Sequence, residues 1–70
     1  MRNKEPWFTV QYIAVTPLGR ISYGGWREVN KWFSTSEKAQ RWIKENAEFF
    51  MEYSVCCNYG EVPKGMIFHG

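Results

Sequence analysis

The pattern of apolar and polar positions in the first half of this 70-residue chain predicts strands. Residues 7–15 are rich in aromatic and β-branched side chains, which is typical of a strand. Residues 16–19, with a proline and a glycine, are suited to a reversing turn, and residues 20–23 are expected to return as a second strand. The glycines at 24–25 supply the positive φ angles of a tight hairpin that leads into a third strand at 26–33.

The period then changes to that of a helix. Ser34 and Glu37 have the spacing of a capping box, and Thr35 is an equally good N-cap. The sequence therefore predicts one amphipathic helix from about Ser36 to about Ala47 or one turn beyond. Its apolar face comprises Ala39, Trp42, Ile43 and Ala47, and Trp42 is expected to lie in the core.

A period of two residues returns over residues 49–58 and predicts a fourth strand. The tail at 60–70 is irregular, and Met66–Phe68 are expected either to add a short edge strand or to fold back as a plug. The whole chain, 1–70, thus reads as a single α+β domain in β-β-β-α-β order. We expect an antiparallel sheet with the helix on one face and an uncovered second face that holds surplus aromatic residues.

Composition sharpens the picture of a small domain that binds. Aromatic residues make up 19% of the chain, which is more than so small a core is expected to bury. Residues 1–44 carry eight basic side chains and three glutamates, a net charge of +5. Residues 45–70 carry one lysine and four glutamates, a net charge of −3. Such an asymmetry can orient the approach of a charged partner, although a solvated surface with chance asymmetry explains it equally well.

The side chains needed for catalysis or metal binding are scarce. The sequence contains no aspartate, its single histidine is the penultimate residue, His69, and its two cysteines, Cys56 and Cys57, are neighbours. These residues fall short of a four-ligand zinc site and of an oriented catalytic set. We therefore expect no enzymatic activity, no metal and no cofactor. Adjacent cysteines are expected to be reduced, and without a secretory or membrane-spanning segment we expect a cytoplasmic protein.

Arginines and aromatic residues alternate along the predicted second and third strands. Side chains of these two kinds form hot spots at protein interfaces, and they also form stacking and phosphate-binding surfaces for nucleic acid. We therefore predict a partner-binding surface there. Its candidate residues are Arg20, Tyr23, Trp26, Arg27, Lys31 and Trp32.

Residues 7–42 resemble the three-stranded DNA-binding domain at the N-terminus of phage integrases. The resemblance lies in the aromatic hairpin strands followed by Phe33, Thr35, Ala39 and Trp42, with Lys38 at the position where that family usually has glutamate. In that family the sheet enters the major groove of DNA. The resemblance implies that Arg20, Arg27 and Lys31 contact bases and phosphates.

The whole chain also resembles, in size and aromatic content, the small accessory proteins that phages and mobile elements encode. These include inhibitors of the host polymerase and anti-CRISPR or other anti-defence proteins. This resemblance implies an inhibitor or modulator that occupies a surface of a host protein or nucleoprotein complex. Two alternatives stay open: an accessory factor that binds double-stranded DNA through the sheet, and a small structural domain that forms a homodimer.

Overall fold

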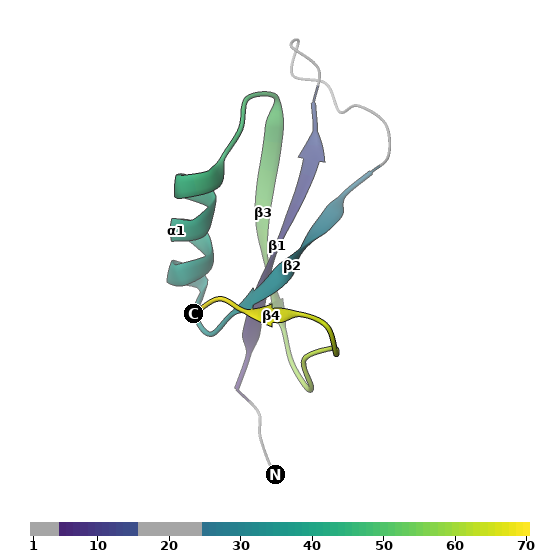
Figure 1. Ribbon diagram of the computed structural model, residues 1–70, viewed down its shortest axis with the longest axis vertical. Coiled ribbons are helices and arrows are strands. Elements are labelled where there is room, and N and C mark those ends of the chain that lie inside the picture. The colour runs from purple at the N-terminus through teal and green to yellow at the C-terminus, as the bar shows by residue number, and fades with distance from the viewer. Residues whose placement is uncertain (1–4, 16–24) are drawn as a thin grey trace.

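The computed structural model describes residues 5–15 and 25–70, which form one four-stranded sheet with one helix (Figure 1). The α+β class that the sequence predicts is confirmed. The predicted second strand, Arg20–Tyr23, lies outside the described residues. The described elements are β1 Trp7–Ala14, β2 Arg27–Phe33, α1 Ser36–Asn46, β3 Met51–Asn58 and β4 Ile67–Phe68.

The strands lie in the order β3-β1-β2-β4, so that β1 and β2 occupy the centre of the sheet. β1 pairs antiparallel with β3 along its whole length, and it pairs antiparallel with β2 with an irregular register between Thr9 and Gln11. Of the two alternatives for Met66–Phe68, the structure has the short edge strand, β4, and it runs parallel to β2. The expectation of a wholly antiparallel sheet is wrong at this edge, because residues 59–66 carry the chain round before it enters β4.

The helix begins where the sequence predicts. Thr35 is the N-cap, and its side-chain oxygen accepts a hydrogen bond of 3.2 Å from the backbone N–H of Lys38, which satisfies one free donor of the first turn. Ser34, the other candidate cap, instead donates from Oγ to the main-chain oxygen of Gly70 at 2.8 Å. The C-terminal residues are thus held at the start of α1.

The hydrophobic core lies between α1 and one face of the sheet. Val10, Phe33 and Ala39 are fully buried there, one each from β1, β2 and α1. Side chains alternate between the two faces of a strand, so the residues two positions from Val10 on β1, Phe8 and Tyr12, also face the helix. The half-buried apolar residues packed against this core are Phe8, Val29, Trp42, Ile43, Tyr53 and Val55.

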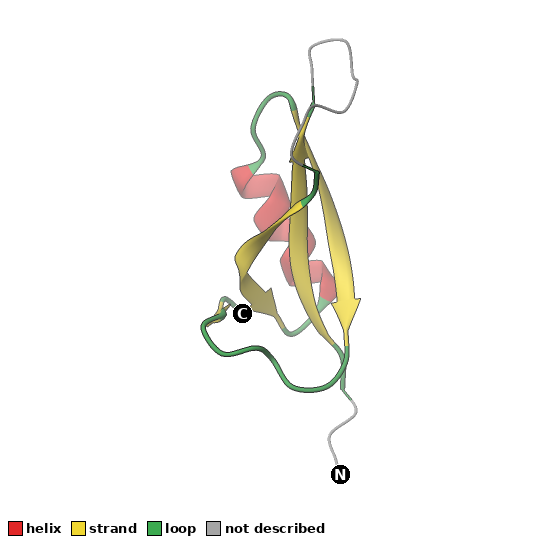
Figure 2. Ribbon diagram, turned by 90° about the vertical axis from the view of Figure 1, so that its right-hand side faces the viewer, coloured by secondary structure: helices red, strands yellow, loops and turns green. Residues whose placement is uncertain are grey.

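The second face of the sheet is partly covered by the chain itself, which corrects the expectation of an open aromatic face. Trp7 is only 9% exposed and Thr9 is fully buried, although both alternate with the helix-facing residues of β1. The indole N–H of Trp7 donates to the backbone oxygen of Gly60 at 2.8 Å, and the Asn30 amide donates to that of Gly65 at 3.0 Å. Figure 2 shows this loop between β3 and β4 at the lower end of the sheet.

Within the described ranges, the structure contains no helix with the length and apolar character needed to cross a membrane.

Candidate functional site

The single helix is too short to cover its face of the sheet. Its 11 residues span about 16 Å, whereas the eight residues of β1 or of β3 span about 26 Å. We call the end of the sheet that holds Trp7, Phe33 and Asn58 the closed end. The end that holds Ala14 and Met51 is the open end, and α1 stops before it (Figure 1).

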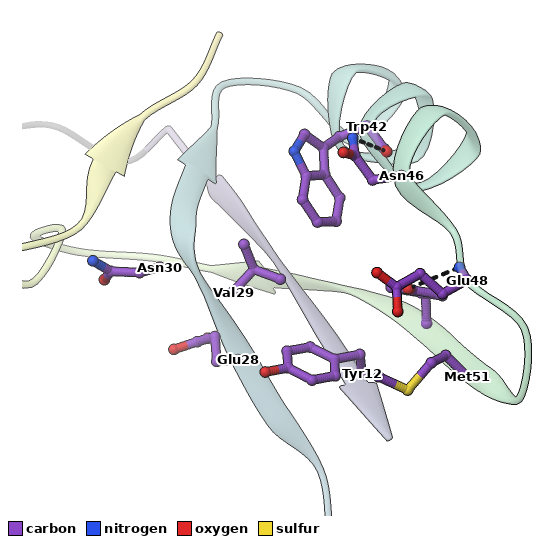
Figure 3. A pocket seen from close by; sticks show the side chains of 9 residues that line it. Tyr12, Glu28, Val29, Asn30, Trp42, Asn46, Glu48 and Met51 are labelled. Carbon is purple, nitrogen blue, oxygen red and sulfur yellow. Dashed lines mark hydrogen bonds between the residues drawn. The ribbon is translucent and has the colours of Figure 1, made fainter. Parts of the chain in front are cut away.

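A groove of about 480 Å³ occupies the space that the helix leaves free (Figure 3). Its floor holds Tyr12 from β1 and Tyr53 from β3, which are directly opposite in the strand register and have ring centroids 6.4 Å apart. Trp42 closes the helix side, and its ring lies 6.4 Å from that of the buried Phe33. Contact with the core therefore fixes the position of the tryptophan, and three aromatic rings line one groove.

Two charged residues border the groove, Glu28 on β2 and Glu48 in the segment after α1, and no lysine, arginine or histidine lines the groove with them. In Figure 3 the Glu48 carboxylate reaches into the space between Trp42 and Tyr12, whereas the Glu28 side chain lies on the other side of β2 and points away from that space. The backbone N–H of Glu48 donates to the Tyr53 hydroxyl oxygen at 3.2 Å, which ties this segment to the floor.

Two adjacent phenylalanines form the turn between α1 and β3, next to the groove. Phe49 is 92% exposed and Phe50 is 58% exposed, and their ring centroids lie 6.4 Å apart. Phe50 has a φ of 60°, in the left-handed region that a bulky residue rarely adopts. The backbone N–H of Val15 donates to the Phe50 oxygen at 2.9 Å, so the turn is pinned to the end of β1.

The sequence pattern places Phe49 and Phe50 in the fourth strand, whereas β3 begins only at Met51. The doublet itself is no signal of a turn, because the aromatic pairs Trp7–Phe8 and Trp32–Phe33 lie within β1 and β2 and cover opposite faces of the sheet.

The predicted partner-binding residues fall into three groups in the structure. Arg20 and Tyr23 lie outside the described residues. Trp26 and Arg27 are exposed at the open end, where Trp26 precedes β2 and Arg27 is its first residue, opposite Tyr12 in the strand register.

The third group, Lys31 and Trp32, lies toward the closed end of β2, and both residues are half-buried. The Trp32 ring is 6.5 Å from that of Trp7 and 4.5 Å from that of Phe68. Trp32 and Trp26 therefore lie at opposite ends of β2, and the Trp32 ring packs against other rings of the same chain. Partner binding by the six predicted residues stays a prediction.

The two cysteines and the histidine do not line the groove. Cys56 and Cys57 are free thiols on β3, and the ring of His69 packs edge-on against Phe33 at 5.2 Å. Residues 5–15 and 25–70 contain no group of three or more histidine, cysteine or acidic residues that could hold a metal ion. A hydrogen bond with Cys57, followed by the negative charge of Cys57 in its thiolate form, raises the pKa of Tyr59.

Comparison with known proteins gives no match for this chain, whether with protein-family models, with curated proteins or with solved structures. The resemblances to integrase domains and to phage accessory proteins therefore stay predictions.

Proposed function

We propose that this chain is a non-enzymatic binding protein that occupies a surface of a partner protein, as an inhibitor or modulator does. The observation that carries the proposal is the exposed phenylalanine turn, Phe49–Phe50, beside an aromatic groove.

The phenylalanine turn contributes little to folding in the isolated chain. Complete burial of one phenylalanine side chain is worth about 1.5–3 kcal/mol, and neither ring obtains that burial here. Phe50 also has a backbone conformation that costs on the order of 1 kcal/mol for a residue with a side chain. Aromatic residues that are exposed, held in place and next to a concavity have the properties of interface hot spots.

The groove next to the phenylalanine turn adds groups that can select a partner. It combines aromatic rings with polar groups, and such a mixture is typical of sites that select a partner. The turn is also fixed at both sides, by the Val15–Phe50 and Glu48–Tyr53 hydrogen bonds. Since less freedom is lost when a rigid surface binds, this arrangement favours affinity.

Affinity capture from nuclease-treated lysate of the source cells tests the proposal. The baits are the unmodified chain, a Phe49→Ser/Phe50→Ser variant and a Trp26→Ala variant as a matched control. Trp26 is 45% exposed at the same end of the molecule but does not line the groove. We expect the unmodified chain and Trp26→Ala to retain the same partner protein, and the double serine variant to lose it.

Three results would contradict the proposal. The first is equal capture by all three baits, which would place the interface elsewhere. The second is capture that disappears with nuclease, together with a shift of duplex DNA at low salt that is lost by about 200 mM, as counterion release requires. The third is sedimentation of the isolated chain as a dimer that Phe49→Ser/Phe50→Ser dissociates, which would make the partner a second copy.

A further inference from the structure

We propose that the groove of Tyr12, Trp42, Tyr53 and Glu48 receives a cationic side chain, an arginine, of the partner protein. The inference names the chemistry of the partner group and so rests on the binding function proposed above. It is carried by the lining of the groove, where aromatic rings surround the carboxylate of Glu48.

Charge is the first argument. The Glu48 carboxylate reaches into the groove and has no ion-pair or hydrogen-bond partner among the described residues. No lysine, arginine or histidine lines the groove, and Arg27 lines the neighbouring cleft instead. A partner that placed a cation beside Glu48 would meet an unpaired opposite charge, whereas a carboxylate or a phosphate there would meet like charge.

The aromatic rings are the second argument. A cation gains free energy when it lies over the face of tryptophan or tyrosine within about 6 Å of the ring centre. In Figure 3, Trp42 and Tyr12 border the space into which Glu48 reaches. A planar guanidinium can stack on a ring while its N–H groups donate to the carboxylate, and this combination favours arginine over lysine.

The size and openness of the groove agree with a side chain as occupant. A volume of about 480 Å³ is within the range of small ligand sites and well above the needs of a bare ion. The exposed Phe49 lies two residues before Met51, which also lines the groove. One partner segment can therefore cover the phenylalanine turn and place an arginine in the groove.

Arg27 provides an internal check on the electrostatic argument. It is opposite Tyr12 in the β1–β2 register and lines a neighbouring cleft with Met51, so its charge opposes an incoming cation. Removal of this charge by Arg27→Gln should strengthen cation binding, whereas Glu48→Gln should weaken it. The Glu48 variant keeps the backbone hydrogen bond to Tyr53, so its fold is expected to be unchanged.

The test is an NMR titration of the full chain with N-acetyl-arginine amide, with the neutral N-acetyl-citrulline amide as the matched probe. The indole N–H signals of the four tryptophans report the location of binding. We expect arginine amide to shift the Trp42 signal most and citrulline amide to shift it weakly. Glu48→Gln should weaken arginine binding about two- to fivefold, and 0.5 M salt should weaken it further.

Equal shifts with both probes, or no effect of Glu48→Gln, would overturn the cation site. Larger shifts at Trp7 and Trp32 than at Trp42 would also overturn it, because those residues line a separate cleft at the closed end with Glu5 and Glu61. The capture experiment distinguishes this failure from failure of the proposed function. If Phe49→Ser/Phe50→Ser abolishes capture while Glu48→Gln does not, the binding function stands and the cation site falls.

Discussion

The two ends of the sheet differ in how far the chain covers its own apolar surface. At the closed end, Phe33 is buried beneath α1 and Trp7 is covered on the opposite face near the loop of residues 59–66. At the open end the helix has stopped, the tyrosine pair lines a groove, and Phe49 is almost fully exposed. Residues of the same chemical type thus occupy opposite environments within one small domain.

This difference separates the residues that hold the fold from those available to a partner. The fully buried core residues belong to the helix-covered part of the sheet, and the loop hydrogen bonds from Trp7 and Asn30 act on the other face. At the open end Ile13 is also buried, but the phenylalanine turn is fixed by polar contacts with little burial. We therefore expect mutations at the closed end to change the free energy of unfolding, and mutations of the exposed phenylalanine turn to change binding.

Phe33→Ala is expected to have the largest effect. The ring is fully buried between β1 and α1, and its loss leaves a cavity that costs about 3–5 kcal/mol. Since small domains have stabilities of about 5–15 kcal/mol, the variant should be close to unfolding. Urea denaturation monitored by circular dichroism measures the change. A loss below about 1 kcal/mol would show that the core does not depend on the closed end.

Trp7→Phe tests the loop that covers the second face. The substitution keeps an aromatic ring but removes the N–H that donates to Gly60, so we expect a loss of about 1 kcal/mol in the free energy of unfolding. Amide hydrogen exchange should show increased opening of residues 59–66 before the rest of the chain. Trp26→Phe is the matched control and should leave both quantities unchanged, because Trp26 is exposed.

Local sequence patterns were sufficient to predict the elements at the closed end. The helix start follows from Thr35 as N-cap and from the spacing of Ala39 and Trp42, and the structure confirms both. The strands that contain Trp7 and Trp32 follow from β-branched and aromatic content. These features are encoded within a few residues of where they act, which is why one sequence reveals them.

The groove and the coverage of the second face depend on contacts between distant segments. The loop hydrogen bond from Trp7 to Gly60 spans 53 positions, and no local pattern encodes it. The parallel pairing of β4 with β2 also depends on contacts between segments that are far apart in the sequence. The sequence pattern does not reveal the candidate site, because it includes Phe49 and Phe50 in the predicted strand, whereas β3 begins at Met51. Tyr12 and Glu48 come together only through the β1–β3 register and the end of α1.

Phe50→Gly is expected to stabilise the fold while it weakens partner binding. Glycine adopts a φ of 60° without the steric cost that phenylalanine has there, and the ring that is lost is 58% exposed. We expect a gain on the order of 0.5–1 kcal/mol in thermal or urea denaturation. Phe49→Ser, at a neighbouring exposed position, should stay within about 0.5 kcal/mol of the unmodified chain. Destabilisation by Phe50→Gly would mean that the ring is part of the fold.

The smallest expected effect concerns Tyr59, just beyond β3 at the closed end. A hydrogen bond with Cys57, followed by the negative charge of Cys57 in its thiolate form, raises the pKa of the Tyr59 hydroxyl above its usual value of about 10. A raised pKa means that the folded chain favours the protonated tyrosine. The contribution of the Tyr59–Cys57 contact to stability is present below the pKa of Tyr59 in the unfolded chain and is lost as the pH rises through its pKa in the folded chain.

Cys57→Ala should move the pKa of Tyr59 down toward its usual value, whereas Cys56→Ala should leave it raised. An NMR titration of the labelled tyrosine ring measures the shift. An unchanged titration in Cys57→Ala would show that this pair does not interact in solution.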